Sequence, residues 1–154
     1  MKASKIFGEQ RVVSTEISIH ATELLCLADE YLSTFERKDL FSFSEDEARV
    51  KAYKRSHYDF AAKASSVVST MGGAVARLSC LLDEADQHFE LDLTVYIGKK
   101  INAFLDYERN IGEYFNDCKK LLAQKSPSPS LLITKTQKLR FDLEAFLAAI
   151  RDEE

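Results

Sequence analysis

Apolar residues recur at alternating steps of three and four along the stretch from Glu45 to Phe89. This alternation places them on one stripe of an α-helix, because the faces of a β-strand repeat every two residues. A helix of about 45 residues would be about 65–70 Å long at a rise of 1.5 Å per residue. The stripe consists of Val50, Tyr53, His57, Phe60, Ala64, Val67, Met71, Ala74, Leu78, Leu81, Ala85 and His88.

Three further segments carry the same alternation: residues 9–38 (or 14–38), 93–124 and 130–151. Residues 39–44 form a short turn after the first segment. The Ser-Pro-Ser-Pro-Ser run at 126–130 ends the third, because proline lacks a backbone donor and restricts the residue before it. We expect the third helix to bury one face made of Ile97, Ile101, Phe104, Glu108, Ile111, Phe115, Cys118 and Leu122.

Short connections force neighbouring helices to run antiparallel, so the sequence predicts an all-α, up-down-up-down bundle of four helices in one domain, residues 1–154. The stripes repeat every 3.5 residues, which predicts coiled-coil packing with a left-handed supercoil. Gly72 and Gly73 lie together in the very long second helix and cost about 2 kcal/mol of helix propensity, which favours a kink. Because the stripe stays in phase across both glycines, we expect one continuous or gently kinked helix.

Composition narrows the class of protein. The chain has 154 residues, 45% of them hydrophobic and 30% charged, as in ordinary soluble domains. A net charge of −4 argues against a dedicated polyanion-binding protein. Residues 1–13 lack the pattern of a signal peptide and no apolar run approaches the length of a membrane span, so we expect a cytoplasmic protein with no membrane contact. The three cysteines lack metal-ligand spacing and should be reduced thiols.

A second, weaker apolar stripe lies on the first helix, on the side that should face away from the core. It consists of Val12, Ile19 and Cys26, each seven residues from the next. One interpretation is a helix that its own chain contacts from two directions. The other is a surface that binds a protein partner or a second copy of the chain. In the second case the protein is a homo-oligomer or part of a larger complex.

The densest basic cluster consists of Arg49, Lys51, Lys54 and Arg55, interleaved with Tyr53 and Tyr58. Basic side chains near aromatic rings can contact phosphates and stack on bases, which makes this cluster a candidate nucleic-acid contact. Tyr53, however, belongs to the core stripe, and residues 45–47 are acidic and lie one turn before the cluster. A solvated helix face therefore explains the pattern better, and nucleic acid is not the favoured partner.

Glu108 is the one charged member of the core stripe of the third helix. Counting from the turns places it opposite Ala74, at the level of Gly72 and Gly73. A buried carboxylate without a partner costs several kcal/mol, so a donor must lie close or the pKa must rise. Arg77 and Arg11 are the candidate donors. Together with Glu108 they would form a buried polar layer or one wall of a small ligand pocket.

The remaining polar motifs do not converge on a catalytic site. Glu16 with His20 and Glu84 with His88 are four residues apart, but a hairpin places the two pairs about 35 Å from each other. His57 is expected to be a buried, hydrogen-bonded histidine near the bundle end. We therefore expect no enzyme, metal or cofactor, and interpret the chain as a helical interaction or assembly protein. An accessory nucleic-acid binder and a small-ligand bundle remain the alternatives.

Overall fold

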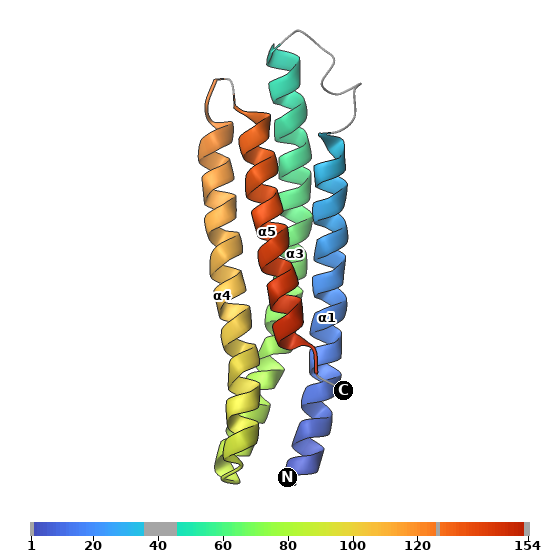
Figure 1. The fold of residues 1–154 in the computed structure, drawn as a ribbon, viewed down its shortest axis with the longest axis vertical. Helices are drawn as coiled ribbons and strands as arrows, with labels where there is room; N and C mark the ends of the chain where they lie inside the picture. Colours follow the sequence, from blue (N-terminus) through green and yellow to red (C-terminus); the bar gives the residue numbers. More distant parts are fainter. Residues whose placement is uncertain (1, 36–45, 126, 153–154) are drawn as a thin grey trace.

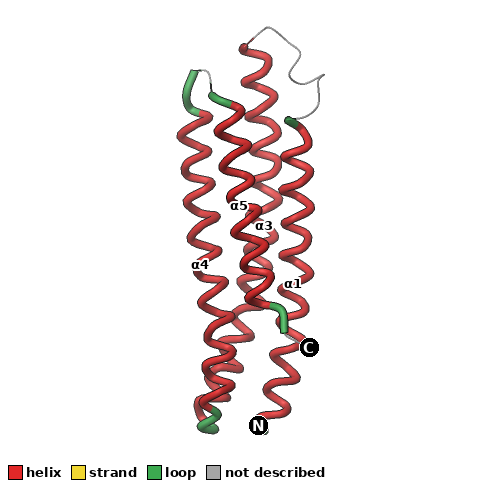
Figure 2. The backbone as a smooth tube through the Cα atoms, in the orientation of Figure 1, coloured by secondary structure: helices red, strands yellow, loops and turns green. Residues whose placement is uncertain are grey.

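The computed structural model describes residues 2–35, 46–125 and 127–152, and these form a bundle of four long helices (Figure 1). Helices make up 91% of the structure, and the described residues contain no strand (Figure 2). The predicted all-α bundle is thus confirmed. The predicted turn at 39–44 lies outside the described residues. The helices are α1 (Ala3–Thr34), α3 (Asp46–Gln87), α4 (Leu91–Leu122) and α5 (Pro129–Ile150).

The long helix α3 runs through Gly72 and Gly73 without a break. A Cβ atom added at Gly72 would lie 3.9 Å from the ring atom Cζ of Phe104, an ordinary packing distance. The helix therefore persists because tertiary packing of its buried face outweighs the weak propensity of two glycines. Phe104 also fixes the register of α3 against α4, since it lies beside Gly72.

Part of α3, Val50–Gln87, is long and apolar enough to cross a membrane by length and composition alone. Core helices of soluble proteins pass the same test, so this finding is weak evidence for a membrane span. Ala64, Met71 and Leu78 of this helix are fully buried in the bundle. Core packing accounts for part of the apolar character, since 39% of the apolar window is buried, and the absence of membrane contact stays a prediction.

Helix α4 presents to the core a face that overlaps the predicted one but is rotated from it. Ile97, Phe104, Ile111, Cys118 and Leu122 are buried as expected, and Ile101 and Phe115 are half-buried against the core. The positions between them are shifted by one residue, so that Glu108 is exposed. Each intervening position moves by about 100° around the helix, and because the other positions are shared, the centre of the buried face rotates by about 50°. The intervening buried residues are Lys100, Tyr107, Tyr114 and Leu121.

The two ends of the bundle differ in the number of helices. The lower end in Figure 1 holds the start of α1 and the turn between α3 and α4, whereas α5 stops well above it. Phe7 of α1 and Tyr96 of α4 stack across the space below α5, with ring centroids 5.8 Å apart. Ile6 and Ile97 are fully buried there. The bundle thus changes from four helices to three at the level where α5 ends.

The turn between α3 and α4 has an unusual residue at its centre. Phe89 has a φ of 58°, in the left-handed region, and its side chain is 87% exposed. The Phe89 amide donates to the carbonyl of Asp86 at 3.1 Å, and the Glu90 amide donates to the carbonyl of Ala85 at 2.9 Å. This pair of bonds is a Schellman motif, in which glycine normally takes the left-handed position.

Candidate functional site

The outer face of α1 carries the apolar residues that the sequence singles out. Val12 is 68% exposed and Ile19 is 63% exposed, and Cys26 is also exposed on the same face. A surface that the chain itself covers would leave these side chains buried. Both α3 and α5 pack against α1, but the described part of the chain leaves its outer stripe open to solvent.

Two threonines complete this stripe. The Thr15 hydroxyl donates to the carbonyl of Arg11 at 2.9 Å, and the Thr22 hydroxyl donates to the carbonyl of Ser18 at 2.8 Å. Because both hydroxyls are bonded within the helix, each threonine can present its methyl group outward. The result is an uncharged line with alternating steps of three and four. We call it the α1 seam; it consists of Val12, Thr15, Ile19, Thr22 and Cys26.

Charged residues flank the α1 seam unequally. Its side toward α3 carries a glutamate in every heptad: Glu9, Glu16, Glu23 and Glu30. Glu16 is bonded to Arg77 of α3, which fixes the direction in which this line faces. The side toward α5 carries Arg11, Ser18 and Leu25 instead. Arg11 lies 3.8 Å from Asp152, in the segment after α5.

An open groove of about 380 Å³ runs along the lower part of the seam, between α1 and α3. Its lining consists of Glu9, Val12 and Val13 from α1 and of Arg77, Cys80 and Leu81 from α3. Cys80 is exposed, as is Val12. The groove extends the apolar surface of the seam onto the neighbouring helix.

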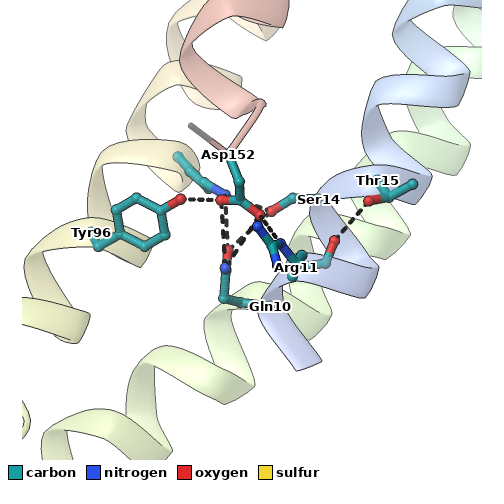
Figure 3. A network of polar contacts seen from close by, with 7 residues as sticks. Gln10, Arg11, Ser14, Thr15, Tyr96 and Asp152 are labelled. Carbon is teal, nitrogen blue, oxygen red and sulfur yellow. Dashed lines mark hydrogen bonds and ion pairs between the residues drawn. The ribbon is translucent and has the colours of Figure 1, made fainter. Parts of the chain in front are cut away.

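A buried polar network lies where α5 ends (Figure 3). Lys100 of α4 is 2% exposed, and its ammonium donates to Gln10 Oε1 at 2.8 Å, to Ser14 Oγ at 2.8 Å and to the Asp152 carboxylate. Gln10 is fully buried and Ser14 is 2% exposed, both on α1. Tyr96 donates its hydroxyl hydrogen to the same carboxylate. Three acceptors around one nitrogen match the three N–H donors of a charged lysine.

In this network, burial and ion pairing shift the pKa values of Lys100 and Asp152 in opposite directions. Burial lowers the pKa of Lys100, and the nearby Asp152 carboxylate opposes that shift without reversing it. For Asp152, burial alone would raise the pKa, but hydrogen bonds from Lys100 and Tyr96 hold the pKa below its ordinary value. The ring of Tyr96 also lies 4.6 Å from the Lys100 nitrogen, a cation–π contact. These contacts stabilise Lys100 and Asp152 as a buried ion pair.

This network is suited to fixing helices rather than to chemistry. The Lys100 nitrogen has no free donor or lone pair for a substrate, and almost no surface through which a substrate could reach it. Cys118 is buried as well, and burial raises the pKa of its thiol to about 11, so it is a poor nucleophile. Within the described residues, no group of three or more His, Cys, Asp or Glu side chains could hold a metal ion.

The predicted polar layer around Glu108 is wrong. Glu108 is exposed, and both candidate donors pair elsewhere: Arg77 with Glu16, and Arg11 with Asp152. The space beside Gly72 holds the ring of Phe104. The buried face of α4 runs through Tyr107 and Ile111, and this turns the Glu108 carboxylate to solvent. Lys100 lies outside the predicted stripe, because apolar Ile101 occupies the neighbouring position between Ile97 and Phe104.

The basic cluster is only partly described. Lys51 and Arg55 are exposed and Lys54 is half-buried, whereas the side chains of Arg49 and Tyr53 lie outside the described residues. No pocket or ordered arrangement joins the described cluster residues to a second basic segment. Their contact with nucleic acid stays a prediction that nothing in the described structure favours.

His57 lies at the opposite end of the bundle from Lys100. It is 2% exposed and packs against the rings of Tyr31 and Tyr114, with centroids 5.8 and 6.1 Å away. Its atom Nδ1 has no hydrogen-bond partner, so the expectation of a hydrogen-bonded histidine is wrong at this atom. Burial lowers the pKa of His57 to about 4, which keeps the ring neutral at pH 7.

The other two histidines pair locally. His20 lies 3.7 Å from Glu23, and His88 lies 3.9 Å from Glu84. Glu16 contacts Arg77 rather than His20.

Compared with protein-family models, with curated proteins and with solved structures, the chain matches none. Function must therefore be argued from the surfaces of this molecule alone.

Proposed function

We propose that this chain is a non-enzymatic interaction or assembly protein, and that the α1 seam is the surface that binds a partner helix. One observation carries the proposal. Val12 and Ile19 are both more than 60% exposed on an uncharged line with heptad spacing. Isolated exposed aliphatic residues are common, but a continuous line rimmed by charges is typical of an interface.

The polar side chains support binding rather than catalysis. The most convergent polar site, around Lys100, uses all its donors within the chain and is covered by protein. Exposed free thiols at Cys26 and Cys80 fit a reducing compartment, so we propose the cytoplasm as the location. A partner helix would lie along α1 with apolar side chains at steps of three and four.

The test compares two charge insertions of equal kind. Ile19→Glu places a carboxylate in the centre of the seam, and Leu105→Glu places one on the exposed side of α4, where Leu105 is 51% exposed. Both variants should keep the melting temperature of the parent within a few degrees, because both sites are on the surface. Each tagged protein is then used to capture partners from a native lysate.

We expect the parent and Leu105→Glu to retain the same partners, and Ile19→Glu to lose at least one of them. Identical capture by all three proteins, with folding intact, would contradict the role of the seam. Loss of the same partner by both variants would show that added charge anywhere, rather than the seam, controls capture.

A further inference from the structure

We infer that the partner of the α1 seam is a second copy of this chain, joined through α1 in a parallel, in-register pair. This inference rests on the proposed function and deepens it, because it names the partner and its orientation. Three features of the molecule support it: the identity of the seam residues, the charges beside them and the small side chains of α3 next to α1.

The seam has the residue pattern of a two-stranded contact. In a parallel pair each position faces its own copy, so that Val12, Ile19 and Cys26 meet their equivalents at one heptad position. Thr15 and Thr22 face the equivalent threonines of the second copy at the other heptad position. Each layer of the parallel pair thus joins identical residues, aliphatic or thiol at the first position and threonine at the second. Antiparallel pairing would instead place Val12 and Ile19 opposite threonine, aspartate or glycine.

The charges beside the seam discriminate between the two orientations. A parallel pair places the glutamate line of one copy against the Arg11, Ser18 and Leu25 side of the other, with Arg11 facing Glu16 of the second copy. Arg11 is 55% exposed and Glu16 is 40% exposed, so both side chains are accessible. Every antiparallel register would bring glutamate against glutamate, such as Glu16 against Glu23. The seam is therefore self-complementary in the parallel orientation.

Helix α3 leaves room for the second copy. The contact between Glu16 and Arg77 sets the level of α3 against α1, and counting along the two antiparallel helices from it puts Ile19 at about the level of Gly73 and Ala74 and Cys26 at about that of Ser66 and Val67. Ser66, Thr70 and Gly73 are small and exposed, and they lie on the side of α3 that carries Arg77. A Cβ atom added at Gly73 would meet nothing within 4 Å. Among the described residues of α3, those beside the central part of the seam are small, apart from Arg77, which is bonded to Glu16.

The first experiment measures mass by light scattering on the purified full chain, under reducing conditions, from ~10 to ~200 μM. We expect a dimer in equilibrium with monomer, because one helix face buries less area than a standard stable interface. Ile19→Glu should raise the dissociation constant at least tenfold. Leu105→Glu is the matched control and should leave it unchanged.

The second experiment tests the orientation with the oxidant diamide. Two facing Cys26 thiols lose two protons and two electrons to one diamide, which becomes the hydrazine, and one S–S bond forms. We expect a covalent dimer in Cys80→Ser, which retains Cys26, and none through Cys26 in Cys26→Ser. In an antiparallel pair with Cys26 opposite Thr15, the two Cys26 residues would be about 16 Å apart and could not join.

The outcomes separate this inference from the function on which it rests. If the chain is a monomer over the whole concentration range, a second copy is not the partner. The role of the α1 seam in binding another protein would still be supported if Ile19→Glu loses a partner captured from the lysate. The parallel orientation is overturned if Ile19→Glu abolishes the dimer but diamide forms no disulfide between the two Cys26 residues. A dimer that survives Ile19→Glu overturns the seam as the self-association surface.

Discussion

At its lower end the bundle buries a charge, and at its upper end it buries neutral imidazole and hydroxyl groups. The Lys100 ammonium has Gln10, Ser14 and Asp152 as acceptors. At the upper end, His57 Nδ1 and the Tyr31 hydroxyl are buried without a hydrogen-bond partner. The lower site thus satisfies every donor of its central group, whereas the upper site leaves some polar atoms unsatisfied.

The difference follows from what each group costs when it leaves water. An unpaired buried charge costs several kcal/mol, so a buried lysine is tolerated only with a complete set of acceptors. A neutral hydroxyl or ring nitrogen costs about 1–3 kcal/mol, which surrounding aromatic packing can offset. The lower end therefore depends on the register of three chain segments, and the upper end depends on the fit of aromatic rings.

The largest expected effect comes from Asp152→Ala, which leaves the Lys100 charge buried beside neutral acceptors only. We expect a loss of about 3–5 kcal/mol in the free energy of unfolding, measured by urea denaturation at pH 7. The control is Asp152→Ala combined with Lys100→Met, which removes both charges and should recover most of the loss. A cost below about 1 kcal/mol for the single variant would mean that Lys100 reaches water by another route.

The second effect tests the upper end with pH. The folded pKa of His57 is about 4, below the ordinary value of 6.5, so the unfolded chain takes up a proton first as pH falls. Stability from this group is present above pH 6.5 and is lost toward pH 4, by about 2 kcal/mol at pH 5. His57→Phe should flatten the profile between pH 7 and 5. An unchanged slope in that variant would assign the pH dependence to other groups.

A smaller effect compares two tyrosines of the upper end. The Tyr114 hydroxyl lies 2.8 Å from the hydroxyl of Thr136, whereas the Tyr31 hydroxyl has no partner. Tyr114→Phe should destabilise the fold by about 1 kcal/mol. Tyr31→Phe should be neutral or slightly stabilising, because it removes an unsatisfied buried group. Thermal melts of the two variants measure both changes in stability. Equal losses would show that the hydrogen bond of Tyr114 contributes nothing specific.

The smallest effect concerns the middle of the bundle, where the structure places no charged layer at Glu108. Glu108→Leu and Glu108→Gln should each change the free energy of unfolding by less than about 0.5 kcal/mol, as expected for an exposed site. Chemical denaturation measures both. A gain or loss above about 1.5 kcal/mol for the leucine variant would return Glu108 to the core.

The sequence predicts the four helices well because each stripe repeats over many turns, and the same periodicity places Val12, Ile19 and Cys26 on the outside of α1. It fails at the face of α4. The two possible faces share Ile97 and Phe104, and each contains one charged residue, Lys100 or Glu108. Their apolar content is nearly equal, so local pattern cannot choose between them.

What decides the face of α4 is the supply of partners from distant parts of the chain. Lys100 meets Gln10 from 90 residues away and Asp152 from 52 residues away. Tyr107, Tyr114 and Leu121 follow Lys100 at steps of seven residues and give the local sign of this face, since all three are large and buried. A stripe search that allowed lysine beside tyrosine would have found it.

Phe89 has a consequence for how this chain can change over generations. Its left-handed backbone costs about 1–2 kcal/mol for a residue with a side chain, and a ring that is 87% exposed contributes little packing in exchange. Selection for stability alone would therefore replace it with glycine or asparagine, which take this position in a Schellman motif at least cost. Glycine at this position in a related chain would indicate selection for stability of the fold. An aromatic residue kept there would indicate selection for a contact that the single chain does not make.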